Sequence, residues 1–534
     1  MPIHKLNLRD VARSCVYRTT YRHWLGLVMV SLCFVAGSAA GAVPLWGDLK
    51  PGPYEVGFTT MEFYDYSRTF SSPRDYYGNP VAGETARPIQ ICVWYPAGPS
   101  DAPSLMLSDY ALPYPEDGRF YEFLSQLQPR EALFIGAITG TEGGQIVELL
   151  NLRVKSRRGA PMADGSFPVI LYCPNRGRGV IENSVMCEYL ASNGYVVAST
   201  HSVGTESINV EVTQDYLETA VTDLGLLLTR LREMPFADVS NIGVIGTGFG
   251  GMVGLLLQMR NYSVRAVVCI DGFTASHQFI RENPYYNAVR ATSPILVASR
   301  SGATVTALVD SMKYSTRHLI SFASAERFDL TTYGKLVSAA RRDSVTARTP
   351  NETYEVLCRH VRDFLDVSLQ EATATEFLFA PAPSDDFSVE VRHGEDAPPS
   401  ALQFYDIIQH GSVDSALTLA ERFVLFAPED PVFPEATINS LGYGFLQAGN
   451  VNAAVEFLRF GTEAYPHSAN AWDSYGEANR HAENIQEAIA AYEKALELLP
   501  FDTTTAESLK EAIRTGATQA LERLKGQPES SDEG

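Results

Sequence analysis

Seven short apolar runs alternate with helical stretches between residues 50 and 375, and this alternation limits the possible fold more than any other feature. The clearest helical stretch between two of these runs is 216–234. Continuous apolar strands separated by helices indicate a mostly parallel sheet with helices on both faces. Ligand sites in such sheets lie at the carboxyl ends of the strands. The predicted strands are 89–96, 168–173, 195–200, 242–246, 266–271, 294–299 and 318–324.

The segment NIGVIGTGFGGMVG (241–254) leads from one of these strands into a helix through a glycine-rich turn, and it fits two motifs. As G-x-G-x-x-G, with Gly246, Gly248 and Gly251, it is a dinucleotide-binding fingerprint, and Asp271 stands twenty residues later, where a ribose-binding acid is expected. As G-x-S-x-G with glycine in place of serine, it is a hydrolase nucleophile elbow without its nucleophile. At least three predicted strands precede the turn, whereas the fingerprint normally opens its domain, so the sequence favours the elbow.

The order of motifs around this turn resembles the platelet-activating-factor acetylhydrolase and dienelactone-hydrolase-like branch of the α/β-hydrolases. The opening GPYEVGFTTMEFYDYSR…RPIQICVWYPA is followed by PVILYCPNRGRG, where the family has a strand that ends in a His-Gly turn. A GYVVAS strand and a long helix then precede GTGFGG, where the family has G-H-S-x-G-G. The resemblance covers residues 50–370 and implies an α/β-hydrolase-like domain over 50–375.

The resemblance also implies where a catalytic triad would lie, and the sequence departs from the family at two of the three positions. The nucleophile position is Gly248, and the general base position, in AERF after the last strand, is Ala325. Only the acid, Asp271 in CIDGF, is retained. A serine esterase needs a hydroxyl for attack and an imidazole to accept its proton. The domain is therefore expected to be catalytically silent.

The same resemblance places the two backbone donors of an oxyanion hole at Phe249 and Gly177, with Asn175 in place of the turn histidine. Backbone donors do not depend on side chains, so an anion or an acyl carboxylate is expected to fit near Gly248. An elbow holds its central residue in a strained conformation that glycine adopts at little cost. Glycine is thus a natural replacement once the hydroxyl is not needed, and the glycines on either side are expected to allow close packing of strand and helix.

Reactive side chains at other rim positions leave a second hypothesis open, an active esterase or lipase-like hydrolase with relocated groups. They form no convincing substitute triad, and each is more simply a loop or surface residue. The threonine beside the elbow is expected to point elsewhere, and His318 begins its strand and so belongs to the opposite end of the sheet. The rim residues are Thr247, His201, Ser202, His277 and Ser301.

The first 42 residues are arranged like a secretory signal peptide. Five basic residues and one acid precede the apolar run LGLVMVSLCFVAG (25–37) and the small residues SAAGA. The run is shorter than the roughly 20 residues that cross a bilayer. We expect cleavage after Ala40 or Ala42, export to the periplasm or medium and no remaining membrane span, with an uncleaved anchor as the alternative. Cleavage changes the formal net charge from −21 to −25, which disfavours nucleic acid as a partner.

Beyond a proline- and acid-rich linker predicted over 380–400, the chain repeats itself. Three alanines are each followed twelve residues later by proline, and the last two units are 34 residues apart, the tetratricopeptide period. The third unit, AWDSYGEANRHAENIQEAIAAYEKALELLP, resembles the helical hairpin of that family. We expect three such repeats and a capping helix over 401–524. The three alanines are Ala416, Ala454 and Ala488.

Three functions remain open at this point. The favoured one is a silent hydrolase fold used for binding or scaffolding, with an acyl or lipid-like molecule in its pocket and a protein or peptide in the groove of the repeats. The second is the relocated hydrolase, and the third is nucleotide binding at the glycine-rich turn. No cofactor and no metal is expected for the favoured function. The last residues, 525–534, are polar and acidic and are predicted to be disordered.

Overall fold

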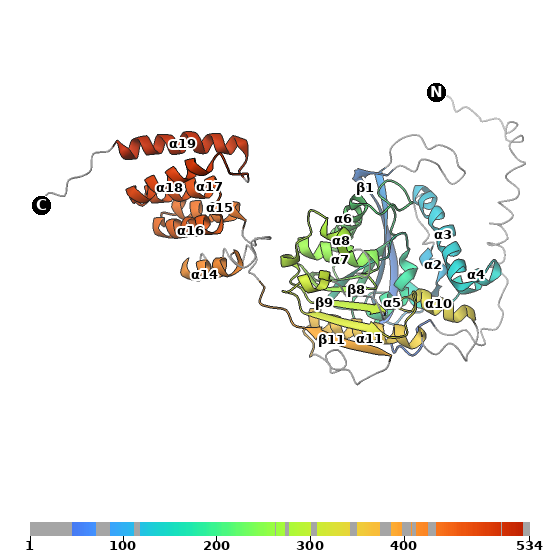
Figure 1. The fold of residues 1–534 in the computed structure, drawn as a ribbon. Coiled ribbons are helices and arrows are strands. Elements are labelled where there is room, and N and C mark those ends of the chain that lie inside the picture. Colours follow the sequence, from blue (N-terminus) through green and yellow to red (C-terminus); the bar gives the residue numbers. More distant parts are fainter. Residues whose placement is uncertain are drawn as a thin grey trace, which may run out of the picture. The chain divides into compact units, whose positions relative to one another are not determined.

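One continuous sheet of eleven strands lies at the centre of the larger part of the chain (Figure 1). The structure is a computed structural model. The predicted signal peptide (1–42) and residues 527–534 of the predicted tail lie outside the residues that it describes. The described residues are 45–70, 86–111, 118–261, 263–272, 277–300, 307–341, 350–373, 386–397, 407, 413–424, 434–503 and 505–526.

All seven predicted strands belong to this sheet, whose order is β11-β10-β9-β8-β7-β5-β6-β2-β1-β4-β3. The six neighbouring strands from β6 to β10 run parallel, and β2 is antiparallel to β6. The predicted α/β-hydrolase-like fold class is therefore confirmed. The predicted strands are β2 (Ala86–Ala97), β5 (Phe167–Cys173), β6 (Val196–Thr200), β7 (Ala237–Thr247), β8 (Val264–Ile270), β9 (Ile295–Arg300) and β10 (Arg317–Phe322).

The sheet also contains strands that the apolar runs did not indicate, because they lie toward its edges and carry polar side chains. They are β1 (Glu55–Thr69), β3 (Ser104–Met106), β4 (Arg153–Arg158) and β11 (Phe387–Arg392). The last of these corrects the predicted linker (380–400). Residues 387–392 pair with β10 in an antiparallel ladder, from Phe387 opposite Phe322 to Arg392 opposite Arg317. The segment resembles a linker because an edge strand is only partly buried, so it can be polar and can be flanked by proline and acidic residues.

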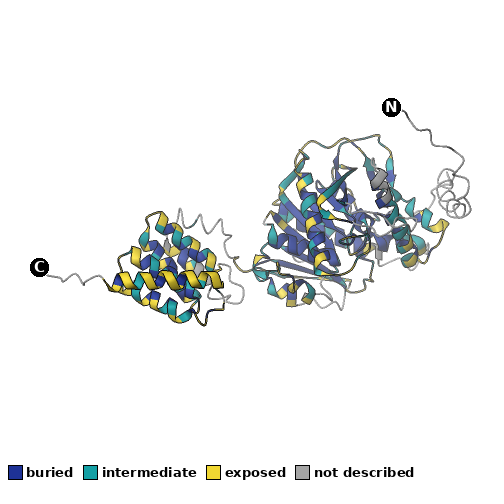
Figure 2. Ribbon diagram, turned by 90° about the horizontal axis from the view of Figure 1, so that it is seen from above, coloured by how far each residue is buried: buried dark blue, intermediate teal, exposed yellow. Residues whose placement is uncertain are grey.

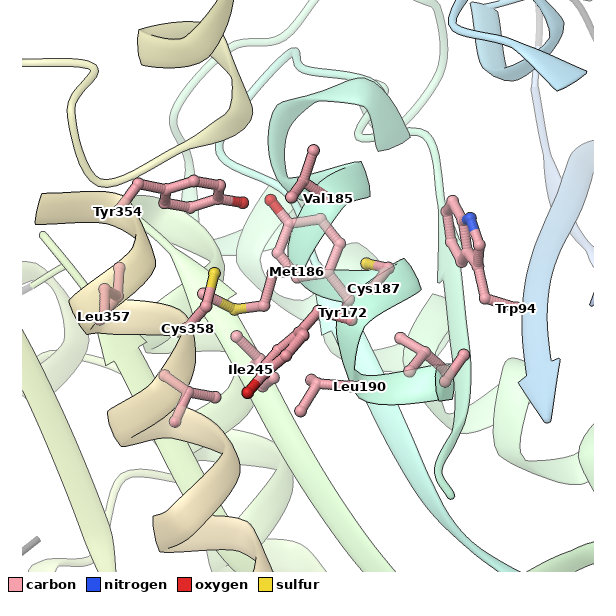
Figure 3. Packing of buried hydrophobic residues seen from close by; sticks show 14 of the residues in the cluster. Trp94, Tyr172, Val185, Met186, Cys187, Leu190, Ile245, Tyr354, Leu357 and Cys358 are labelled. Carbon is pink, nitrogen blue, oxygen red and sulfur yellow. The ribbon is translucent and has the colours of Figure 1, made fainter. Parts of the chain in front are cut away.

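Each face of the sheet has its own hydrophobic core, as expected when successive strand residues point to opposite sides. In β5, Ile170 and Tyr172 pack on one face with α5 (Ser184–Ser192), α10 (Thr332–Arg341) and α11 (Pro350–Leu369). Figure 3 shows Tyr172 in this cluster beside Met186 and Cys358. On the other face, Val169 and Leu171 pack with α6 (Gln214–Leu231) and α7 (Phe249–Arg260). Figure 2 shows the buried sheet between these helices.

Helix α6 confirms the helix predicted over 216–234, and shorter elements surround the strand ends. Among the described residues, none of the helices combines the length and the apolarity that crossing a membrane requires. The remaining elements of this unit are α2 (Ser108–Ala111), α3 (Gly118–Thr139), α4 (Gly144–Leu150), η2 (Val180–Asn183), α8 (His277–Arg281), η3 (Ala288–Arg290) and α9 (Ala307–Ser311).

Residues 396–534 form a second compact unit, separate from residues 1–395. Its described helices are α14 (Val413–Val424), α15 (Glu435–Gln447), α16 (Val451–Ala464), α17 (Ala469–His481), α18 (Ile485–Leu498) and α19 (Glu507–Lys525). Glycine allows close contact inside two successive hairpins. A Cβ on Gly442 would lie 2.4 Å from Leu458, and one on Gly476 would lie 2.9 Å from Tyr492. The two crossings are equivalent, since 34 residues separate Gly442 from Gly476 and likewise Leu458 from Tyr492.

Candidate functional site

The turn between β7 and α7 has the backbone of a nucleophile elbow. Gly248, at its apex, has φ +54° and ψ −118°, a backbone conformation that residues other than glycine adopt only under strain. Its N–H donates to Ile270 O at 2.8 Å, which holds the apex against the end of β8. Packing accounts for the flanking glycines, because a Cβ on Gly246 would lie 2.1 Å from Gly250 O and one on Gly250 would lie 2.1 Å from Cys173 O.

The side chain of Asn175 fills the space that a side chain at the apex would need. A Cβ on Gly248 would lie 2.5 Å from Cγ of Asn175 and 2.6 Å from both of its terminal atoms. Asn175 Oδ1 also accepts hydrogen bonds from the N–H groups of Phe249, at 3.1 Å, and of Arg176, at 2.8 Å. The predicted oxyanion donor Phe249 is thus already engaged within the protein.

The second predicted oxyanion donor, Gly177, is engaged as well. Its N–H donates to Oγ of Ser202 at 3.1 Å, and Ser202 Oγ shares a short hydrogen bond with the hydroxyl of Tyr216. A Cβ on Gly177 would lie 1.9 Å from Nη2 of Arg130, so the arginine packs directly against this backbone. The N–H groups of Phe249 and Gly177 are therefore both hydrogen-bonded within the protein, and neither is free to hold an anion in this conformation.

Asp271, the predicted acid of the triad, is paired with an arginine. Its Oδ2 accepts a hydrogen bond from Nε of Arg300 at 3.0 Å, while Oδ1 is buried and has no hydrogen-bond partner among the described residues. Burial raises the pKa of Asp271 above its ordinary value, against the opposing charges of Arg300 and Arg327. Ala325, in the predicted base position, lies in the loop after β10, where it packs on the hydrophobic core. The acid therefore orients a guanidinium, and an arginine does not act as a general base because it stays protonated.

The other reactive side chains do not assemble a second triad in the described part of the chain. Thr247 points into the core, where its Oγ1 accepts from Asn183 Nδ2 at 2.7 Å. His201 is 7% exposed, and its Nε2 is buried without a hydrogen-bond partner. Burial lowers the pKa of His201 to about 4, so its imidazole is neutral at pH 7. Ser301 and the side chain of His277 lie outside the described residues, and His318 lies in the first half of β10, as predicted.

Glu182 is a site residue that the sequence gave no reason to select. It is 3% exposed, and its Oε2 accepts hydrogen bonds from Asn175 N–H at 2.7 Å and from Tyr172 Oη at 2.9 Å. Burial raises the pKa of this carboxyl to about 7, against those two hydrogen bonds. Glu182 therefore fixes the backbone of Asn175, whose side chain in turn covers the elbow.

A small cavity of about 20 Å³ lies at the carboxyl ends of β5 and β6. Helix α3 supplies two charged residues to it, which no sequence motif indicated. We call it the His201 cavity, after the buried imidazole that lines it. Its polar lining consists of Arg130, Glu131, Gly177, Arg178, His201 and Ser202.

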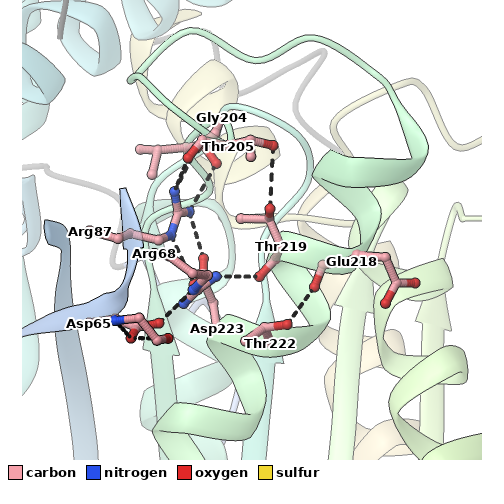
Figure 4. A network of polar contacts seen from close by, with 11 residues as sticks. Asp65, Arg68, Arg87, Gly204, Thr205, Glu218, Thr219, Thr222 and Asp223 are labelled. Atoms are coloured by element: carbon pink, nitrogen blue, oxygen red, sulfur yellow. Dashed lines mark hydrogen bonds and ion pairs between the residues drawn. The ribbon is translucent and has the colours of Figure 1, made fainter. Parts of the chain in front are cut away.

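A buried ion-pair network holds the loop that follows Ser202 (Figure 4). Arg87, which is 1% exposed, pairs with Asp223 Oδ2 at 2.7 Å and donates to the carbonyl oxygen of Gly204, also at 2.7 Å. Arg68 pairs with Oδ1 of the same carboxylate at 2.7 Å. The network connects β1 and β2 to α6 and to the loop at 203–205, so it fixes one wall of the site.

The glycine-rich turn offers little to a pyrophosphate in this conformation. The N–H of Phe249 is bound by Asn175, and that of Gly251 donates to Gly248 O at 3.1 Å. Asp271, the proposed ribose ligand, is paired with Arg300. In the described residues, no three histidine, cysteine, aspartate or glutamate side chains come together as metal ligands would.

Comparison with known proteins gives likenesses among solved structures only. No protein-family model matches the chain, and no curated protein matches it in sequence. Among solved structures, a ferulic acid esterase from Streptomyces cinnamoneus is similar to this chain, with a TM-score of 0.45 and 18% sequence identity over 66% of this chain and 98% of the esterase chain. The hydrolase-like fold is evident from the chain's own strand order and from the turn at Gly248.

Proposed function

We propose that this is an exported protein whose α/β-hydrolase fold has lost its chemistry and serves in binding. The observation that carries the proposal is the position of the Asn175 side chain, which fills the space beside Gly248 and accepts a hydrogen bond from the N–H of Phe249. An esterase needs that space for its nucleophile and that donor for the oxyanion. Here both are used to stabilise the turn itself.

The charges around the triad positions support the same conclusion. Acyl transfer requires a base that alternates between neutral and protonated forms near neutral pH. Ala325 has no ionisable group, and Asp271 is paired with Arg300 at 3.0 Å. The arrangement stabilises the end of the sheet through an ion pair, and it provides no route for a proton.

We further propose that the helical unit is a stack of tetratricopeptide-like repeats that binds a protein or peptide. The support is the 34-residue spacing of Gly442 and Gly476, together with that of Leu458 and Tyr492, which these glycines contact. Ala454 and Ala488, also 34 residues apart, are completely buried. Repeats of this kind bury a continuous core and present an extended concave surface.

One observation favours a relocated hydrolase as the second candidate. His201 has an unpartnered ring nitrogen and is adjacent in sequence to Ser202, which carries a hydroxyl. The geometry weakens this candidate, since Ser202 Oγ bonds to Gly177 N–H and Tyr216 instead of to His201. A nucleophile must be within hydrogen-bond reach of its base.

The proposal is tested with the purified chain from residue 43 onward, treated with a fluorophosphonate serine probe and assayed with short acyl esters. We expect no labelling and no hydrolysis above the rate in water. A Ser202→Ala variant is the matched control. Stoichiometric labelling that disappears in this variant would replace the binding function with a relocated esterase centred on Ser202.

A further inference from the structure

The buried ring nitrogen of His201 is a polar group for which the fold itself supplies no partner. Only 7% of the surface of His201 is exposed, and its Nε2 forms no hydrogen bond with any described residue. Buried polar groups are nearly always hydrogen-bonded, so an orphan such as this one indicates a water or a ligand. The His201 cavity has room for about one water, or for the oxygen atoms of a small ligand group.

Two arginines line the same cavity, and neither forms a close ion pair with a carboxylate of the described residues. Arg130 donates through Nη1 to Ile208 O at 2.7 Å, and the guanidinium of Arg178 stacks on the ring of Phe134, 3.3 Å from its centroid. Neither forms an ion pair within 4.0 Å in the described part of the chain. Burial and the charge of Arg178 lower the pKa of Arg130, against the opposing charge of Glu131. The two cations thus repel each other, and an anion between them would relieve that repulsion.

The carboxylate that lines the cavity does not cancel this charge. Glu131 Oε1 accepts the hydroxyl hydrogen of Tyr333 at 2.5 Å, so it is turned toward α10. Burial raises the pKa of Glu131, while the hydrogen bond from Tyr333 and the charges of Arg178 and Arg130 oppose that shift. The lining of the cavity therefore holds two guanidinium groups against one carboxylate, in a protein whose formal net charge is −21.

We propose that the His201 cavity binds the carboxylate head of a small organic acid, with Arg178 and Arg130 as its cationic partners and His201 as a hydrogen-bond donor. A planar guanidinium pairs with a planar carboxylate through two parallel hydrogen bonds. A cavity of about 20 Å³ holds only the oxygens of such a head, so the body of the acid lies in the open mouth. Tetrahedral phosphate is bulkier and fits this space less well.

The inference rests on the proposed function. In a silent hydrolase fold the acid is the ligand itself, whereas in an active esterase it would be a reaction product. The two are tested separately, because probe labelling reports on catalysis and carboxylate titration reports on binding. Labelling would overturn the proposed function, and absence of carboxylate binding in an unlabelled protein would overturn only this inference.

The experiment is a calorimetric titration of the chain from residue 43 onward with sodium acetate, sodium butyrate and sodium phosphate at constant ionic strength. We expect saturable binding of both carboxylates and weaker binding of phosphate. Arg178→Gln should weaken carboxylate binding by about tenfold or more, since it removes a charge-assisted pair. Arg176→Gln is the matched control, because Arg176 is exposed on the same loop and does not line the cavity, and it should leave the affinity within about twofold.

If Arg178→Gln fails to fold, the titration is repeated with His201→Phe. This variant removes the imidazole donor and keeps an aromatic ring, and it should also weaken carboxylate binding. Three results would overturn the inference: no saturable carboxylate binding by the unsubstituted chain, equal weakening by Arg176→Gln, or tighter binding of phosphate than of acetate.

Discussion

A Cβ on Gly248 would lie 2.5 Å from Cγ of Asn175, so the elbow apex and the loop after β5 cannot both carry side chains in their present positions. The asparagine is itself fixed, by Glu182 at its N–H and by Phe249 and Arg176 at its Oδ1. Asn175 therefore occupies, in a fixed position, the space that any side chain at position 248 would need.

The first prediction follows from this contact. Triad members act as a unit, so the sequence alone suggests that Gly248→Ser with Ala325→His would restore a small esterase rate. Because Asn175 blocks the new serine, we expect this double variant to remain inactive and the triple variant with Asn175→Gly to show a small, measurable rate. Ester hydrolysis measures it, and the triple variant with Gly248→Ala instead of serine is the control. A double variant as active as the triple one would show that Asn175 is no obstacle.

The second prediction concerns the packing of α7 against β5. A Cβ on Gly250 would meet the carbonyl oxygen of Cys173 at 2.1 Å, and backbone cannot move aside cheaply. Gly250→Ala should lower the free energy of unfolding by about 1–3 kcal/mol or more. Gly225, in α6, has no atom within 4 Å of its Cβ position, so Gly225→Ala should raise it by about 0.5–1 kcal/mol. Urea denaturation compares the two, and effects of the same sign would refute the packing argument.

The central strands of the sheet could be predicted from the sequence because they are buried on both faces and are therefore apolar throughout. The segment 168–173 is an example, since every residue of β5 is buried. By contrast, β11 alternates exposed and half-buried residues, and its partner strand lies about 70 positions earlier in the chain. Such a strand is defined by long-range pairing, which composition does not reveal.

The candidate site could be predicted only where backbone conformation and residue type coincide. Gly248 was placed at the apex of a turn because a motif of fixed spacing specifies that position. The side chains that contact the predicted site residues could not be predicted. Arg300 donates to Asp271, and Arg130 extends from α3 to Gly177, and both contacts depend on the tertiary structure. An amide side chain such as Asn175 has no pattern of its own that would indicate which backbone groups it binds.

The third prediction tests the network at the wall of the site. Asp223 is 6% exposed and is the carboxylate for both Arg87 and Arg68, at 2.7 Å each. Asp223→Ala leaves a buried arginine without its counter-charge and should lower the free energy of unfolding by about 3–5 kcal/mol. Glu233→Ala removes an exposed ion pair with Arg230 and should change it by about 0.5 kcal/mol or less. Comparable losses in the two variants would contradict the role of burial.

The last prediction concerns pH. Burial raises the pKa of Glu182 from 4.5 to about 7 in the folded protein, so the folded state holds a proton that the unfolded state has already released between these values. The stability that this proton provides is complete below about pH 4.5 and is lost as the pH rises through 7. Its full size is on the order of 3 kcal/mol, from 1.36 kcal/mol per pKa unit.

Glu182→Gln should remove this dependence, because an amide stays neutral at every pH and its oxygen can still accept from Asn175 and Tyr172. The variant should therefore become more stable relative to the unsubstituted protein as the pH rises from 4.5 to 7. Above pH 7 the difference in unfolding free energy should level off. Glu218→Gln is a control of opposite sign, since hydrogen bonds from Arg260 lower the pKa of Glu218 and its stabilisation is lost as the pH falls. Denaturation curves at several pH values measure both, and a difference for Glu182→Gln that stays constant from pH 4.5 to pH 8 would show that this carboxyl is ionised in the folded protein throughout.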